Sequence, residues 1–251
     1  MSLPVLISDA LAIQPLAAGI FLVDKPVGHS SFWVVKQVRK ALGIKKVGHA
    51  GTLDPFASGL LVVCAGRAAT RIISQFMAGE KEYEAVLKLG VETDTFDTEG
   101  KVVATHPVPA FDLQQVEECL RGFVGEQLQT PPSFSALKHK GKPLYYYARR
   151  GLPVVKEPRK VVIRELSCLD VVKDVVTIRV TCGKGTYIRS LAADIGVALE
   201  TGACLIGLRR LRSGVFSVRD AIDGALLSDP KVGRPLLMAN FMDVETALLR
   251  L

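Results

Sequence analysis

The spacing of hydrophobic and polar residues along the chain predicts a series of short strands. Two uninterrupted apolar runs, at 19–24 and 60–64, are typical of buried strands. In the segment 81–89 apolar side chains occupy every second position, which predicts a strand with one buried face. Two further runs rich in β-branched residues, 161–171 and 175–182, predict two more strands later in the chain.

Helical spacing of apolar residues occurs in three other segments. Ser30 and Ser31 can cap a helix that ends at Gly43, and Asp112 with Gln115 has the spacing of a capping box. The core-facing positions of the three helices are Val34, Val35, Val38 and Leu42; Val116, Cys119, Leu120 and Phe123; and Ile188, Leu191, Ala192, Ile195 and Leu199. Because strands and helices do not alternate regularly, we expect an α+β fold around a mixed sheet, not a doubly wound parallel sheet.

The composition excludes several classes of protein. The chain has 251 residues, of which 49% are hydrophobic and 6% aromatic, so it can bury a sizeable aliphatic core and is neither disordered nor a coiled coil. No stretch approaches the roughly 18 apolar residues of a membrane span. The five cysteines are scattered, so we expect reduced thiols in a cytoplasmic protein, not a disulfide framework or a zinc site.

The positive charge is concentrated in one segment. The net charge is +7, and residues 136–164 contain nine Lys and Arg but one acid, Glu157. Two lesser acid-free stretches are 36–46, with five basic residues, and 205–219, with four. Each run taken alone could be a solvated face, but three such runs with few aromatic residues favour a nucleic acid over a membrane as partner.

Familiar cofactor and metal motifs are missing from the sequence. Gly183-Lys184-Gly185-Thr186 lacks the upstream glycine of a phosphate loop, and residues 94–100 lack the ligand spacing of a calcium loop. The four histidines form no metal pair and no Ser-His-Asp set. We therefore expect no cofactor and no metal.

One glycine-bracketed turn presents polar side chains before a buried strand. In the stretch 48–55, Pro55 restricts Asp54 to extended backbone, and Gly48 and Gly51 allow close approach of another group. An aspartate before proline is most often a turn residue, and a lone histidine such as His49 is more often structural than catalytic. The residues alone leave both interpretations open.

The sequence GHAGTLDPFASGLL, which starts at Gly48, closely resembles the signature of the TruB family, bacterial tRNA pseudouridine synthases that modify uridine 55 in the T loop. One further motif of the family lies before this signature, FLVDKPVGHSS (21–31). The others come after it in the same order as in the family: Lys81-x-Tyr83 followed by Leu89-Gly90 and Thr93-Asp94-Thr95, QTPPSFSALKHKGKPLYYYARRG (129–151), CGKGTYIRSLAADIG (182–196) and IGLRRLRSG (206–214). The resemblance implies the pseudouridine synthase fold, with a central mixed, mostly antiparallel sheet flanked by helices and an RNA-gripping insertion.

The resemblance also implies roles for individual residues. The catalytic residues are Asp54, the single essential carboxylate; Arg189, which pairs with it and favours its charged form; and Tyr83, which stacks on the target base and can help to remove the C5 proton. The apolar face that Tyr83 shares with Ala85, Leu87 and Leu89 also suits a core aromatic residue, and both roles can hold together. His49 occupies space vacated by flipped nucleotides, and Tyr187 and Leu208 line the pocket. The other expected substrate-binding residues are Lys25, as a structural or RNA contact, and Lys138, Lys140, Lys142 and Arg149 in the basic segment.

The expected domain organisation follows the same resemblance. Residues 1–18 form an N-terminal extension and residues 19–251 the catalytic domain, with the basic RNA-gripping segment at about 126–160; the family's C-terminal PUA-like domain is absent or truncated. The expected partner is the T-stem loop of tRNA, bound by a monomer without a guide RNA.

Two other functions remain as alternatives. One is a guide-RNA-dependent, dyskerin-like catalytic subunit, against which the long segment 129–144 and the missing PUA-like region argue. The other is a non-catalytic tRNA-binding or tRNA-folding protein, against which the presence of Asp54, Tyr83 and Arg189 argues.

Overall fold

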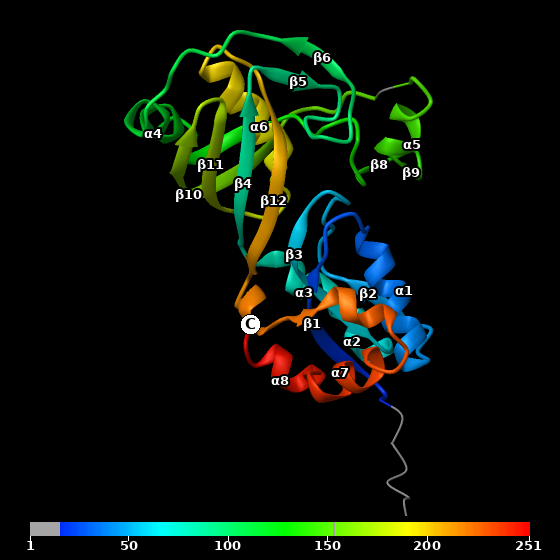
Figure 1. The fold of residues 1–251 in the computed structure, drawn as a ribbon. Helices are drawn as coiled ribbons and strands as arrows, with labels where there is room; N and C mark the ends of the chain where they lie inside the picture. The colour runs from blue at the N-terminus through cyan, green and yellow to red at the C-terminus, as the bar shows by residue number, and fades with distance from the viewer. Residues whose placement is uncertain (1–15, 153) are drawn as a thin grey trace, which may run out of the picture.

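The computed structural model describes residues 16–152 and 154–251, and most of its strands form one ten-stranded sheet (Figure 1). The strands of this sheet are β1 (Gly19–Lys25), β2 (Val47–His49), β3 (Ser58–Ala65), β4 (Lys81–Leu89), β7 (Gly125–Gln129), β10 (Arg159–Val172), β11 (Val175–Cys182), β12 (Ala203–Ser213), β13 (Phe216–Ser217) and β14 (Ile222–Asp223). Two small sheets pair β5 (Val91–Thr93) with β6 (Val102–Thr105) and β8 (Lys138–His139) with β9 (Lys142–Pro143).

The strand order of the large sheet is β14-β1-β3-β12-β4-β11-β10-β7, with β2 beside β3 and β13 beside β12. Only β1 with β14 and β12 with β3 run parallel among the described pairs of this sheet. The predicted α+β fold with a mixed, mostly antiparallel sheet is therefore confirmed.

Helices cover the sheet on both sides of its midpoint (Figure 1). They are α1 (Ser31–Leu42), α2 (Arg67–Arg71), α3 (Ile73–Ala78), α4 (Leu113–Arg121), α5 (Leu144–Ala148), α6 (Ile188–Ala198), α7 (Gly233–Ala239) and α8 (Val244–Leu248), with short 3₁₀ turns η1 (Val218–Asp220) and η2 (Gly224–Ser228). In the half that contains β4, β11 and β10, α6 packs on β12 and α4 on β10. In the half that contains β1 and β3, α1 packs beside α7.

The predicted helix ends are confirmed. The Ser30 side chain accepts a hydrogen bond from the backbone N–H of Trp33 at 3.1 Å, and Gly43 ends α1 in the left-handed conformation. At the start of α4, Asp112 and Gln115 form both hydrogen bonds of a capping box. Helix caps can be predicted from the sequence because each is formed by residues within one helical turn of one another.

The predicted strands are also present, and among the described strands of seven or more residues one was missed. The alternation of 81–89 matches the burial of β4, in which every second residue is buried. The apolar run at 60–64 lies inside β3, which extends one or two residues further at each end. The missed strand is β12, because its arginines led us to interpret 205–219 as a basic surface stretch.

A close approach of two strands joins the halves of the sheet. The pairing of β12 with β3 consists of Arg209 with Ser58 and Arg210 with Gly59. Gly59 has φ +104°, and a Cβ there would lie 2.3 Å from the carbonyl oxygen of Arg210. Only glycine allows this junction, directly after the turn that carries Asp54.

The basic segment, expected at about 126–160, is an excursion from the edge of the sheet. Gln129 at the end of β7 pairs with Arg159 at the start of β10, so the chain leaves and re-enters the sheet at neighbouring positions. In between, β8 and β9 form a hairpin whose turn residues, Lys140 and Gly141, both have positive φ, and α5 follows. The limits of this segment, and the division at residue 18, stay predictions, and residues 1–15 of the expected extension lie outside the described residues.

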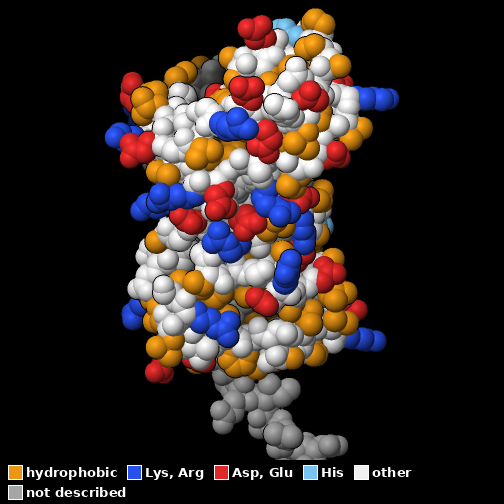
Figure 2. All heavy atoms as spheres, turned by 90° about the vertical axis from the view of Figure 1, so that its left-hand side faces the viewer, with side chains coloured by type: hydrophobic (Ala, Val, Ile, Leu, Met, Phe, Trp, Pro, Cys, Tyr) orange, Lys and Arg blue, Asp and Glu red, His pale blue; other side chains and the backbone are white. Residues whose placement is uncertain are grey.

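The face shown in Figure 2 carries a band of closely mixed positive and negative side chains across its middle. Ion pairs join strands of the sheet: Arg179 with Glu84 and Arg212 with Glu82 between neighbouring strands, and Arg209 with Asp24 across β3. The pair of Arg209 and Asp24 links β12 to β1 and so connects the two halves. Most of the arginines on these strands are thereby neutralised.

The part of the chain that the structure describes contains no helix with the length and apolar character needed to cross a bilayer. Within residues 16–152 and 154–251, no three His, Cys, Asp or Glu side chains gather into a group that could hold a metal ion. All five cysteines are unpaired, and four of them are buried while Cys119 is partly exposed.

Candidate active site

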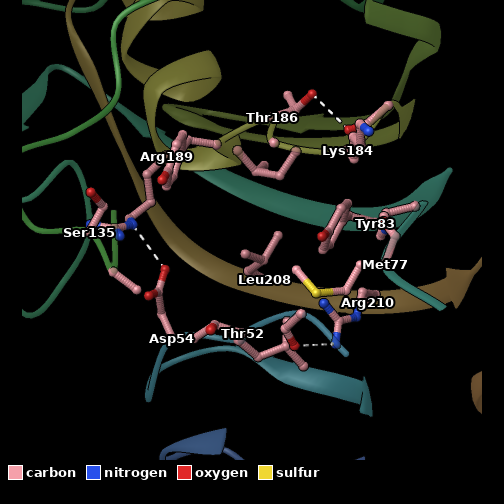
Figure 3. Close-up of a pocket in the computed structure, with 18 residues that line it drawn as sticks. Thr52, Asp54, Met77, Tyr83, Ser135, Lys184, Thr186, Arg189, Leu208 and Arg210 are labelled. Atoms are coloured by element: carbon pink, nitrogen blue, oxygen red, sulfur yellow. Dashed lines mark hydrogen bonds and ion pairs between the residues drawn. The ribbon is translucent and has the colours of Figure 1, made fainter. Parts of the chain in front are cut away.

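Two pockets meet at the junction of the two halves. The first, of about 270 Å³, is lined by Tyr83, Tyr187, Leu208 and Arg210 together with Asp54 and Arg189. The second, of about 660 Å³, shares Asp54 and Arg189 and is also lined by His49. In Figure 3 Asp54 points from the loop before β3 toward Arg189, and Tyr83 and Leu208 lie on the strands behind them. Asp54 and Arg189 are therefore the common floor of one cleft.

The loop that carries Asp54 is fixed by the start of α1. The hydroxyl of Ser31 accepts from the backbone N–H of Leu53 at 2.8 Å and donates to its carbonyl oxygen at 2.9 Å. The N–H of Ala57 donates to the carbonyl oxygen of Asp54 at 3.1 Å, and that of Gly28 to Pro55 at 2.8 Å. Both ends of the turn are held, so the carboxylate is presented by a rigid backbone.

Lys25 supports this turn from below. Its side chain is fully buried, and its Nζ donates to the backbone oxygens of Pro26, His29 and Pro55 at 2.9, 2.6 and 3.4 Å. Burial lowers the pKa of Lys25 to about 8. Of the two expected roles, the structure supports the structural one, because an ammonium group enclosed in this way cannot reach a phosphate.

Arg189 is buried and has a partner for each nitrogen of its guanidinium group. Its Nε lies 3.0 Å from Oδ2 of Asp54, and its Nη1 lies 3.4 Å from Oδ2 of Asp97. Nη1 also donates to the carbonyl oxygen of Thr95 at 3.0 Å, and Nη2 to that of Phe134 at 2.8 Å. The ion pair that the family resemblance implies is present, and the arginine cannot turn away from Asp54 without breaking other bonds.

The pKa of Asp54 depends on more than its pairing with Arg189. Arg189 favours the carboxylate, as expected, but burial outweighs it and raises the pKa of Asp54 above its ordinary value, and the nearby carboxylate of Asp97 raises it further. The sequence did not show these two opposing effects, nor that the arginine serves two acids.

Asp97 is a site residue that sequence reasoning missed. Its side chain is buried, and its Oδ1 accepts from the Thr95 hydroxyl at 2.6 Å and from the N–H of Glu99 at 2.9 Å. The Thr93 hydroxyl donates to its carbonyl oxygen at 2.8 Å. The acidic stretch 94–100 was examined only as a calcium loop, and its alternating Asp and Thr are the signal that could have found this turn.

Tyr83 and Leu208 form the wall of the first pocket from neighbouring strands. Arg210 on β12 is the register partner of Tyr83 on β4, and Leu208 is that of Ala85. Tyr83 is 9% exposed and belongs to the core of its half, as a core aromatic residue would, and it also lines the first pocket. Burial raises the pKa of Tyr83, which keeps its phenol protonated at neutral pH. That favours a stacking role over that of a base.

Arg210 is the second residue that sequence reasoning missed. It is 1% exposed, and its Nε donates to the carbonyl oxygen of Leu60 at 2.7 Å while Nη2 donates to that of Gly51 at 3.3 Å. It therefore holds the Asp54 turn against β12 beside Tyr83. Its place in the motif 206–214 was the available signal, but a basic run does not reveal which of its arginines is buried.

Tyr187 and His49 lie at opposite ends of the cleft. The N–H of Tyr187 donates to Oε1 of Gln129 at 2.7 Å, and Nε2 of Gln129 donates back to the carbonyl oxygen of Tyr187 at 3.1 Å. The ring Nδ1 of His49 is buried and has no hydrogen-bond partner among the described residues. Burial lowers the pKa of His49, so its ring is neutral at pH 7.

The four basic residues expected to contact RNA are all exposed. Of these, Arg149 lines the second pocket, and its guanidinium lies 5.5 Å from the ring centroid of Tyr145. Lys138, Lys140 and Lys142 lie on the hairpin and do not line the cleft. Residues 145–147 are three consecutive tyrosines, of which Tyr146 and Tyr147 pack edge to face and Tyr145 is exposed.

Known proteins are similar to this chain in sequence and in fold. The model of the family described as "TruB family pseudouridylate synthase (N terminal domain)" matches residues 39–188. A protein of Desulfotalea psychrophila named tRNA pseudouridine synthase B is 58% identical over 214 residues, which cover 83% of this chain and 87% of that protein. One of Chlamydia pneumoniae with the same name is 46% identical over 221 residues, covering 88% and 92%.

A solved chain in the "Crystal Structure of a Cbf5-Nop10-Gar1 Complex" superposes with a TM-score of 0.69 at 29% identity. The match covers 93% of this chain and 62% of that chain, so this chain spans less than two thirds of the solved one. The cleft pairs the buried guanidinium of Arg189 with two carboxylates, of which Asp97 is 3% exposed and Asp54 33%, so Asp54 is the acid that faces the open space. Together with the sequence relatives, this cleft shows that the chain belongs to the TruB family of pseudouridylate synthases.

Proposed function

We propose that this protein converts uridine 55 in the T loop of tRNA to pseudouridine, with Asp54 as the catalytic carboxylate. The observation that carries the proposal is the ion pair of Asp54 with the buried Arg189 at the floor of the cleft. The relatives named tRNA pseudouridine synthase B support tRNA as the substrate. The exposed basic segment supports a polyanionic partner.

The reaction breaks the N1–C1′ glycosidic bond and rejoins the uracil through C5. Ordinary glycosidases use two carboxylates, one of which protonates the leaving group. Uracil leaves as a delocalised anion and stays in the pocket, so one carboxylate suffices. Attack on C1′, addition at C6 and removal of the ribose 2′ proton all need Asp54 ionised, and Arg189 is the group that opposes its protonation.

The target base must leave the folded loop to reach Asp54. The first pocket provides a place for it, with the ring of Tyr83 and the side chain of Leu208 beside the carboxylate. The protonated phenol and the neutral ring of His49 suit an uncharged base. We propose that His49 occupies the space that the turned-out nucleotides leave.

The proposal includes action as a monomer in the cytoplasm without a guide RNA. The guide-dependent alternative has one observation in its favour, the likeness of the fold to a chain solved in a complex with other proteins. Incubation of the protein alone with unmodified tRNA transcript separates the two. We expect pseudouridine at position 55, mapped by sequencing, and none in a transcript with cytidine at that position. Absence of product without a guide RNA would contradict the stand-alone function.

A further inference from the structure

An exposed aromatic side chain lies at the rim of the second pocket. Phe32 is the second residue of α1, and its ring is 50% exposed although it lines the same pocket as Asp54. The buried face of this helix consists of Val34, Val35 and Val38. Phe32 lies outside that face, so packing in the core does not explain an aromatic residue at this position.

Two cations lie against this ring. Nζ of Lys36 is 5.3 Å and the guanidinium carbon of Arg39 is 5.5 Å from the ring centroid of Phe32. The spacing of four and seven residues places all three side chains on one helix face. Nη2 of Arg39 also donates to the carbonyl oxygen of Val47 at 2.9 Å, which fixes its position, whereas Lys36 is exposed. We call these three residues the Phe32 platform.

The sequence around the platform contains no acid. Residues 25–53 include six Lys and Arg and no Asp or Glu. In Figure 1, α1 lies on the same side of the molecule as α5, and the face with the paired charges in Figure 2 is on the other side. The basic residues of α1 therefore lie on the same side of the molecule as those that flank α5.

The pocket has the opposite charge at its floor. Asp54, Asp97 and Glu99 line it and outnumber the buried cation there, Arg189. At its rim, Arg149 and Tyr145, which is 42% exposed, form a second pair of cation and aromatic ring. Phosphates are repelled by the floor and attracted by both rims. A nucleic acid strand fits this pattern when its bases point inward and its backbone follows the rims.

We propose that the Phe32 platform binds a nucleotide next to the target uridine, with the base stacked on Phe32 and a phosphate against Lys36. The proposal rests on the proposed function for the identity of the RNA. Aromatic rings bind unpaired bases by stacking without sequence preference, and cations beside the ring add to this. The platform thereby holds the strand that flanks the uridine turned into the first pocket.

The test measures binding of a T-stem-loop RNA to the Asp54→Asn protein, so that no turnover occurs during the titration. We expect Phe32→Ala to weaken binding roughly fivefold or more and Phe32→Trp to bind as well as the parent. Phe241→Ala is the matched control, because Phe241 is 39% exposed and packs against Gly19, away from the cleft. Thermal melting checks that each variant is folded.

A fluorescent base reports the stacking directly. 2-Aminopurine replaces the loop nucleotides beside uridine 55 one at a time, and stacking on an aromatic ring quenches it. We expect one loop position at which the fluorescence of 2-aminopurine is quenched when residue 32 is Phe or Trp and is brighter when it is Ala. We also expect Lys36→Ala to flatten the dependence of log affinity on log salt by roughly 0.7 to 0.9, and Lys231→Ala to leave it unchanged.

Two results would overturn the proposal. Equal affinity of the parent and Phe32→Ala, with no position that responds, would mean that the platform does not bind RNA and is free for a protein partner. An equal loss in Phe241→Ala would mean a general effect. If the wild-type protein modifies tRNA but Phe32→Ala has an unchanged KM, the platform fails while the proposed function stands. If the wild-type protein forms no pseudouridine, the proposed function fails, and the binding measurements still decide the platform.

Discussion

Nε of Arg189, in the first turn of α6, lies 3.0 Å from Oδ2 of Asp54, in the turn before β3. The two residues are 135 positions apart in the sequence and come from different halves of the sheet. The arginine is 5% exposed and the carboxylate 33%, so the acid faces the cleft and the base lies behind it. This places the open side of Asp54 toward a substrate.

The first prediction concerns the carboxylate itself. Asp54→Asn keeps the shape of the side chain and removes its charge, so we expect no detectable pseudouridine while the affinity for tRNA stays within a few fold. Product is mapped after single-turnover incubation, and affinity is measured by filter binding. Substantial turnover by carefully purified Asp54→Asn protein would contradict the catalytic assignment.

The second prediction concerns the dependence of activity on pH. Asp54 must be ionised, so kcat/KM falls as the pH falls through its pKa, which gives the pH profile an acidic limb. Because burial raises the pKa of Asp54, the midpoint of this limb should lie above the ordinary value of 3.8. Arg189→Met removes the stabilising cation, so the limb should move to higher pH and turnover at neutral pH should fall roughly 100-fold. Asp97→Asn removes a repelling charge, so the limb should move to lower pH.

These opposite shifts separate an electrostatic role from a structural one. A change that merely loosens the site would lower the rate at every pH and leave the midpoint of the limb in place. Arg189→Lys keeps the charge without the planar fork, so we expect it to restore part of the rate and of the midpoint. Movement of both limbs in the same direction would contradict the sharing of Arg189 by two carboxylates.

The third prediction concerns Lys25 and protein stability. Its pKa is about 8 in the folded protein and 10.5 when exposed, so between these pH values the unfolded chain binds more protons. The free energy of unfolding should therefore gain a contribution from Lys25 that rises with pH over this range. Urea denaturation at pH 8 and pH 10 measures it, and Lys25→Met should lack this part of the rise. Equal pH dependence of the two proteins would mean that burial does not lower the pKa of Lys25.

The fourth prediction tests the basic segment as an RNA grip. If Lys138 and Lys140 contact phosphates, replacing both with Gln should flatten the slope of log affinity against log salt by about one to two units. The single-turnover rate at saturating tRNA should change little, because these residues lie on the hairpin outside the cleft. Titrations at several salt concentrations give the slope.

Two exposed lysines away from the cleft provide the control. Lys173 lies in the turn between β10 and β11, and Lys231 follows η2, so Lys173→Gln with Lys231→Gln removes the same charge elsewhere. If both double variants flatten the slope equally, only net charge matters and the segment does not grip RNA.

Local features of the fold were predictable because short-range physics decides them. The cap at Ser30, the capping box at Asp112 and the alternation in 81–89 each depend on residues within a few positions of one another. β12 was not predictable in this way. Its arginines are paired with acids on other strands or buried, and a sequence does not show which strands will lie near it.

The features of the candidate site likewise fall into those that local sequence determines and those that it does not. The sequence by itself determined the family, the turn that presents Asp54 and the concentration of basic residues, since each is written in contiguous motifs. Only the tertiary structure decided that Lys25 is enclosed, that Arg189 serves Asp97 as well as Asp54, and that Arg210 fastens the turn to β12. The reason is that burial and charge balance arise when distant segments pack together, and these set the pKa of the carboxylate.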